Sequence, residues 1–421
     1  MSASPTSSAA PRAAAALVVG LTVAVAAWPA APALATNTGD KPRLRVTLFD
    51  GTVHEGEVKF TKDRLEVKGR RAAKVRYRDI ASLSDVPPPD EAELASRRAE
   101  HARRAERLGQ GDAAGWTRLG QWAREQELDE EARSAFERAV ALDPDHAPAR
   151  RGLGQLKDDD GAWVDGVDVV RRRRGDLEPG DLDAVVDLAR FALKNGLEDP
   201  AFTLLRQVLN QDTYHEKAIE LSRPFTAAYR QRVPMALPLR GRWKASEDPT
   251  RHHQRKAWAV YALDIMKVDA AGRTHTGRGD KLEDYLTWDE PFYAVAAGRV
   301  AEVRDGNPDN PARTVPPGVA EKHNGVTIDH GDGEVSWYVH ARNGSIVVKV
   351  GDQVERGQLL GRIGNSGASA VPHLHFTLVA HGNLSVPWAC DDYVLIAPDS
   401  TPIPVTRAFP REGWTFEGKE P

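Results

Sequence analysis

Two histidines separated by one residue stand in Pro372-His373-Leu374-His375-Phe376. The run from His373 to Val379 alternates as a β-strand would, and residues two apart on a strand project to the same side, roughly 6.6 Å apart. One imidazole of such a pair can hold a metal ion while the other reaches a water bound to that metal. Paired histidines also occur on solvated strand faces, so the pair needs companions before it indicates a site.

The companions lie upstream and follow a fixed order. Of the 13 histidines in the chain, eight lie between Arg251 and Phe376. His252-His253 comes first, followed by the strand-like segment from Ala257 to Ile265, which contains Tyr261-Ala262-Leu263-Asp264. Next come Trp337-Tyr338-Val339-His340 and a turn that reads Gly-Arg-Ile-Gly-Asn-Ser-Gly at 361–367. This order of His, Asp, Y-x-H, G-N-S-G and H-L-H-F is difficult to obtain by chance.

Together these motifs resemble the lysostaphin-like zinc metalloendopeptidases, also called the LytM family. The resemblance extends from about Arg251 to Leu378, close to a third of the chain. It implies a mainly antiparallel β-sandwich domain at residues 231–421, with a zinc ion in a groove between loops. It also implies hydrolysis of peptide bonds in peptidoglycan stem peptides or crossbridges, with no cofactor besides zinc.

Carried over to this sequence, the resemblance implies that His253, Asp264 and His375 are the zinc ligands. Two imidazoles and a carboxylate suit this cation, which would lower the pKa of a bound water to about 7. His373 would then act as the general base towards that water. His340 would hydrogen-bond the developing oxyanion or position the water.

The sequence departs from the commonest pattern of the family at the first ligand. The first His and Asp are usually four residues apart, whereas His253 and Asp264 are eleven apart, an arrangement that some members share. His252 is therefore kept as an alternative ligand, with His253 preferred. The pair formed by His275 and Asp280 is rejected, because its odd spacing places the two on opposite faces of a strand and the intervening glycines favour a loop.

A chain of 421 residues is long enough for two or three independently packed units, so we expect a multidomain α+β protein. Residues 1–35 have the layout of a secretory signal peptide: an apolar run, then Ala33-Leu34-Ala35, with cleavage before Thr36. Alternating apolar residues at 36–89 predict a small antiparallel β-barrel that resembles Sm-like barrels. Three prolines at 87–89 mark the boundary that follows.

Residues 90–230 are predicted to form helices. Trp116, Leu119, Gly120 and Ala123, followed by a second set ending at Ala139, resemble a tetratricopeptide repeat, in which small residues let paired helices approach closely. Degenerate copies are expected to follow, with the stretch from Lys157 to Asp181 as an inserted loop. Such arrays usually bind another protein or peptide, so we expect a partner there.

The balance of 57 Lys plus Arg against 61 Asp plus Glu excludes the basic excess typical of nucleic-acid binding. One cysteine, Cys390, leaves no internal disulfide, and no segment after the signal resembles a membrane span. The sequence thus predicts an exported zinc metalloendopeptidase of the periplasm or extracellular envelope, and it is silent on the oligomeric state. The alternative is an inactive lysostaphin-like module that activates other cell-wall hydrolases.

Overall fold

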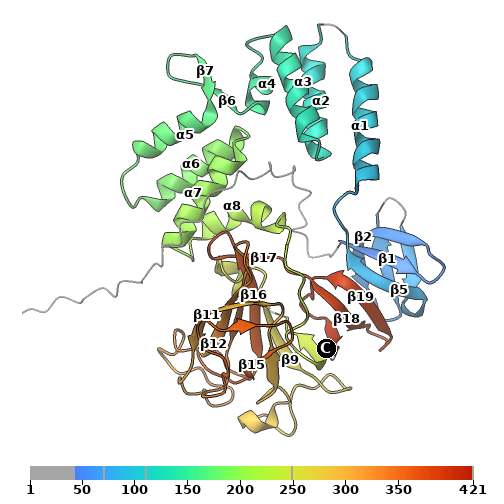
Figure 1. Ribbon diagram of the computed structural model, residues 1–421, viewed down its shortest axis with the longest axis vertical. Helices are drawn as coiled ribbons and strands as arrows, with labels where there is room; N and C mark the ends of the chain where they lie inside the picture. Colours follow the sequence, from blue (N-terminus) through green and yellow to red (C-terminus); the bar gives the residue numbers. More distant parts are fainter. Residues whose placement is uncertain (1–42, 70–71, 110, 248–249, 420–421) are drawn as a thin grey trace, which may run out of the picture. The chain divides into compact units, whose positions relative to one another are not determined.

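The computed structural model describes residues 43–69, 72–109, 111–247 and 250–419, and Figure 1 shows the helices and strands that they form. The predicted signal peptide, residues 1–35, lies outside the described residues, as do residues 36–42 of the predicted barrel. The described part of the chain is mixed α and β, as expected, with strands at both ends and helices between them. None of these helices is long and apolar enough to cross a membrane.

Residues 43–85 form five consecutive antiparallel strands whose alternating apolar side chains are buried on one face. The strands are β1 (Arg43–Leu48), β2 (Val53–Phe60), β3 (Arg64–Lys68), β4 (Ala73–Arg76) and β5 (Ile80–Asp85). Gly51 has φ 82°, which suits the predicted Asp50-Gly51 turn. β5 also pairs in parallel with β19 (Pro402–Ala408), so this sheet continues into the C-terminal region. Closure into an Sm-like barrel stays a prediction.

The first helices confirm the expected close approach of one helix pair. They are α1 (Glu91–Glu106), α2 (Ala113–Glu125), α3 (Asp129–Leu142) and α4 (Ala147–Gly152). A Cβ atom on Gly120 of α2 would come within 2.7 Å of the Phe136 ring of α3, so only glycine permits this packing. The tetratricopeptide family itself stays a prediction.

The stretch from Lys157 to Asp181 is not the inserted loop that the sequence predicts. It contains β7 (Trp163–Asp165), which pairs with β6 (Gln155–Lys157), and the helix α5 (Gly166–Gly175). Asp165 caps α5 through its side chain, and Val169 and Val170 are buried. Four consecutive arginines make this helix difficult to predict from the sequence, because they lower its apolar content without preventing helix formation.

Three further helices complete the α region: α6 (Leu182–Lys194), α7 (Glu198–Gln211) and α8 (Glu216–Ala227). Their buried Leu, Val and Ala side chains form a core that also includes Ala257 and Leu384 of the C-terminal region. The helical region and the C-terminal region therefore share buried contacts.

The C-terminal region is built on a long antiparallel sheet, which includes the strands β11, β12, β13, β16 and β9 in that order. β16 is central and buried along its whole length, and Phe376 on it contacts the rings of Tyr338 and Trp388. The remaining strands continue or flank this sheet. The strands are β8 (Gly241–Ala245), β9 (Leu263–Lys267), β10 (Pro291–Tyr293), β11 (Gly298–Arg304), β12 (Gly325–Asp329), β13 (Val335–Val339), β14 (Gln353–Val354), β15 (Leu359–Arg362), β16 (Leu374–Ala380), β17 (Leu384–Val386), β18 (Cys390–Ile396), β19 and β20 (Thr415–Gly418).

A fully buried carboxylate holds the segment that follows α8. Glu334, in the turn between β12 and β13, is 0% exposed. It accepts hydrogen bonds from the Tyr229 hydroxyl at 2.8 Å and from the backbone N–H groups of Arg232 and Val233 at 2.6 and 3.0 Å. Hydrogen bonds to a buried charge are stronger than neutral ones, so this contact should stabilise the join between the helices and the sheet.

We expect Glu334→Ala to lower the free energy of unfolding by about 2–4 kcal/mol, because it leaves the buried Tyr229 hydroxyl and two partly buried backbone N–H groups without an acceptor. The urea midpoint of the full chain measures this change. The exposed Glu355→Ala serves as the control and should leave the midpoint in place. An unchanged midpoint in the Glu334 variant would show that the contact contributes nothing.

Candidate metal centre

Strand pairing explains how His375 and Asp264, which are 111 positions apart in the sequence, come together. β16 lies between β9 and β13, and in the β9 pair His375 stands directly opposite Asp264. Side chains directly opposite on antiparallel strands project to the same face and lie within reach of each other. On the other side of β16, Val339 of β13 stands opposite His375, and His340 follows it at the end of the strand.

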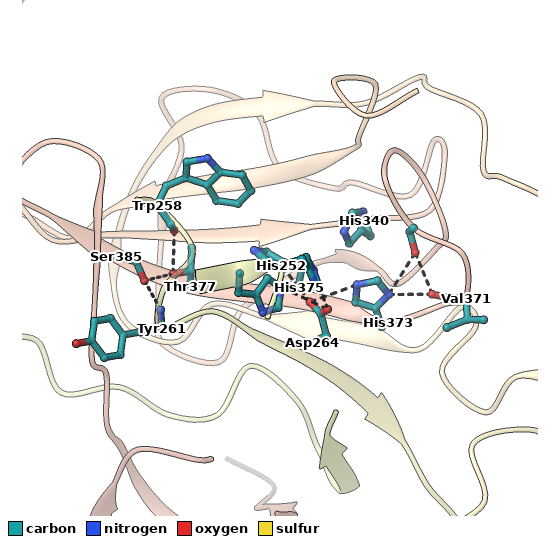
Figure 2. Close-up of polar contacts among 12 residues, drawn as sticks. His252, Trp258, Tyr261, Asp264, His340, Val371, His373, His375, Thr377 and Ser385 are labelled. Atoms are coloured by element: carbon teal, nitrogen blue, oxygen red, sulfur yellow. Dashed lines mark hydrogen bonds and ion pairs between the residues drawn. The ribbon is translucent and has the colours of Figure 1, made fainter. Parts of the chain in front are cut away.

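The Asp264 carboxylate is the centre of the cluster (Figure 2). Its Oδ1 lies 2.9 Å from Nδ1 of His375 and 3.4 Å from Nε2 of His373. Its Oδ2 lies 3.4 Å from Nε2 of His253 and 3.9 Å from Nε2 of His252. The structure thus brings both candidate first ligands, the aspartate and the H-x-H pair together.

The two adjacent histidines differ in burial. Ligand atoms of His252, His253 and Asp264 all lie within 4.8 Å of one another, a spacing at which one metal ion could be held. His375 is not in that group of three, although its Nδ1 is the nitrogen closest to Asp264 among these distances. The His253 side chain is 3% exposed and that of His252 is 47% exposed. Both remain within reach of a metal at Asp264.

His373 is held by the loop before β16. Its Nδ1 lies 2.8 Å from the carbonyl oxygen of Val371 and 3.2 Å from Oγ of Ser369. A carbonyl can only accept, so Nδ1 of His373 carries the proton and donates it to Val371. Nε2 is then the nitrogen that faces Asp264 and the cleft.

His340 is fixed in the same way. Its Nδ1 donates to the carbonyl oxygen of Ser366 at 2.7 Å, which leaves Nε2 for chemistry. Its backbone has φ 70°, a conformation that costs a residue with a side chain energy and that clusters at functional sites. The His340 and His373 rings have their centroids 4.6 Å apart. Both histidines therefore present Nε2 near the same place.

Burial and mutual charge set the protonation of the cluster. Burial raises the pKa of Asp264, but the charge of His373 and hydrogen bonds from His253, His373 and His375 outweigh it and hold the pKa well below its ordinary value. Burial lowers the pKa of His375 to about 4, against the attraction of Asp264. Burial, with His373 and His375 nearby, holds the pKa of His340 well below its ordinary value. An ionised aspartate and neutral imidazoles are the forms that bind metals.

Burial also lowers the pKa of His373, but the Asp264 charge and a hydrogen bond to it have the larger combined effect and raise that pKa. The same carboxylate therefore acts on both histidines of the H-x-H pair. At His375 burial outweighs it and the pKa stays low, whereas at His373 it raises the pKa and so makes Nε2 more basic.

The segment from Ala257 to Ala262 is not the strand that the sequence predicts. It forms turns, and strand structure begins only at Leu263. Ser385 on β17 holds it, because its Oγ accepts from the Tyr261 N–H at 2.9 Å and lies 3.1 Å from Oγ1 of Thr377 (Figure 2). The alternating apolar residues there pack against the helical region and β17, which the strand pattern could not reveal.

Sequence reasoning missed several residues around the site. Ser369 contacts His373, and its hydroxyl donates to the Asn365 side chain at 2.6 Å, so this turn serves to hold His373. A cleft of about 640 Å³ opens over the cluster and is lined in part by Trp258 and Trp337. Among them, Trp337 precedes the Y-x-H motif and Ser369 follows the G-N-S-G turn, so sequence signals lay nearby for these two.

Two other histidines do not join the cluster. The His275 ring meets the Tyr285 ring edge-on, with centroids 5.4 Å apart and outside the lining of the cleft, so the rejected His275 and Asp280 pair stays outside the centre. His330 follows β12 and bonds the Ala297 carbonyl and the Ser336 hydroxyl, both at 2.8 Å. It has a structural place in the turn.

The residues present fit a metal ion. Nε2 of His375 is buried and has no hydrogen-bond partner in the described part of the chain. Four imidazoles have a nitrogen within 4.0 Å of one carboxylate, so several possible metal ligands converge on one point. Imidazoles with a carboxylate are a donor set of catalytic zinc sites.

Comparisons with known proteins agree with this site. Residues 285–387 match peptidase family M23. This segment includes His340, His373 and His375, whereas His253 and Asp264 precede it. Family M23 peptidases use zinc, so the match and the donor set confirm the predicted cofactor.

A curated relative is the peptidoglycan DD-endopeptidase ShyA of Vibrio cholerae, 42% identical over 59 residues, which are 14% of this chain and 13% of that protein. A zinc-containing peptidase from Vibrio cholerae is 19% identical, covering 41% of each chain with a TM-score of 0.24. The lysostaphin catalytic domain from Staphylococcus simulans is 22% identical, covering 33% of this chain and 78% of that one with a TM-score of 0.21. The C-terminal region of this chain thus contains a peptidase domain of family M23.

Proposed function

We propose that this chain is an exported zinc metalloendopeptidase that hydrolyses peptide bonds in the stem peptides or crossbridges of peptidoglycan. The observation that carries the proposal is the convergence of Asp264 with His253, His373 and His375 at the base of an open cleft. The peptidoglycan endopeptidase that shares 42% identity over 59 residues supports the substrate class. Export rests on the signal-like sequence at 1–35.

We assign His253, Asp264 and His375 as the ligands. His253 is preferred to His252 because a buried imidazole that faces a carboxylate gains more from a metal than a half-exposed one that water can solvate. When bound, zinc polarises the substrate carbonyl and makes a water molecule more acidic. The chain itself supplies the ligands, the orientation of the neighbouring histidines and the shape of the cleft.

His373 is proposed as the general base and His340 as the group that positions the water or the oxyanion. In both, a backbone carbonyl fixes the proton on Nδ1, so Nε2 is the atom that exchanges protons or hydrogen bonds with the reactants. Fixing the tautomer before the substrate arrives avoids reorganisation during the reaction.

Mass analysis of fragments released from purified peptidoglycan tests the overall proposal, and undigested sacculi would contradict it.

Asp264→Ala should abolish zinc binding, because it removes the carboxylate that all four histidines face. Metal analysis of the purified full chain should give about one zinc in the wild type and a large loss in the variant. Asp280→Ala, which changes an exposed aspartate outside the cleft, is the matched control and should keep its zinc. Comparing His252→Ala with His253→Ala decides the first ligand, and we expect the loss with His253.

His373→Ala should retain zinc and lose hydrolysis by about 10²- to 10⁴-fold, because it removes a base and not a ligand. The turnover of peptidoglycan peptides and the zinc content are measured on the same preparation. Turnover at the wild-type rate would refute the assignment. Loss of zinc would instead make His373 a ligand.

A further inference from the structure

The loop between α7 and α8 is fixed beside the metal centre. The loop consists of Asp212 to His215, and the carbonyl oxygen of Thr213 accepts a hydrogen bond from the N–H of Ala257 at 3.0 Å. Ala257 lies in the segment that joins the first proposed ligand to Asp264. Thr213 and Tyr214 line the same cleft as His253, although the sequence places them in the helical region.

This end of the cleft has an aromatic wall. Tyr214 is 52% exposed, so much of its ring is accessible to a ligand in the cleft. The rings of Trp258 and Trp337 stack with centroids 5.8 Å apart, and Trp258 lies 5.8 Å from the His375 ring. A substrate that extends from the metal towards the helical region would cover these rings and gain from burying them.

Lys256, on the same wall, has no carboxylate as an ion-pair partner among the described residues. Nζ of Lys256 lies 5.1 Å from the Trp258 ring, and no carboxylate lies within 4.0 Å of it among the described residues. Arg304, which also lines the cleft, is paired with Glu302 at 2.6 Å. The charge of Lys256 is therefore available to a ligand.

We propose that the α7–α8 loop and Lys256 form a substrate subsite, in which Lys256 pairs with a carboxylate of the substrate peptide and Tyr214 covers an adjacent apolar part. This inference rests on the proposed peptidase function and deepens it. It makes the helical region part of the substrate cleft. A charge on the wall selects among peptides chiefly by whether they bear a free carboxylate.

Binding is tested in the zinc-loaded full chain with His373→Ala, which prevents cleavage during the titration. The probes are one peptidoglycan-derived peptide with free carboxylates and the same peptide with these carboxylates amidated. We expect the parent to prefer the free form by about two- to fivefold, as suits a partly exposed ion pair. Adding Lys256→Met should remove this preference, whereas Lys349→Met, an exposed lysine outside the cleft, should keep it.

Tyr214→Ala should weaken the binding of both peptides alike by about tenfold, and Tyr214→Phe should restore it, because the ring and not the hydroxyl provides the cover. A preference that survives Lys256→Met would overturn the carboxylate assignment. Unchanged affinities in Tyr214→Ala would overturn the role of the loop. In either case hydrolysis by the wild type would leave the proposed function standing, whereas a wild type that neither binds nor cleaves these peptides would end both.

Discussion

The structure of the peptidase domain depends on one partly buried carboxylate whose charge must be compensated. Asp264 lies opposite His375 across an antiparallel strand pair and has imidazoles within 4 Å on both sides. An unpaired carboxylate charge at this position would destabilise the fold, so the cluster is stable only while the histidines or a bound cation compensate that charge. The same requirement that shapes the fold at this point therefore creates the metal site.

Two backbone carbonyls extend this constraint to the proposed catalytic histidines. The carbonyl oxygens of Ser366 and Val371 each accept a hydrogen bond from Nδ1 of one of these histidines, and both belong to the turns between β15 and β16. The Ser369 hydroxyl and the Asn365 amide hold the same turns through buried hydrogen bonds. The Nε2 atoms of the two proposed catalytic histidines are thus positioned by loops that a rigid central strand supports, a common arrangement for functional residues.

The helical region is joined to this domain by buried contacts. Ala257 and Leu384 belong to the apolar core of α6–α8, and Glu334 accepts hydrogen bonds from residues just after α8. The segment carrying the first proposed ligand is therefore supported from both sides, by β17 and by the α7–α8 loop. A rigid support on two sides suits a site whose ligands come from irregular backbone as well as from strands.

The sequence by itself identified the residues that the fold gathers around Asp264, because H-x-H, Y-x-H and the preceding His and Asp are chemical types in a fixed order. It also determined the β1–β5 strands and most helices, because alternation and helical periodicity are local properties. It misjudged 257–262 and the inserted segment around α5, where packing against distant elements outweighs local pattern. Only the tertiary structure decided the opposition of His375 and Asp264, the Nδ1 protons of His340 and His373, and the place of Tyr214 at the cleft, because each depends on contacts between segments far apart in the chain.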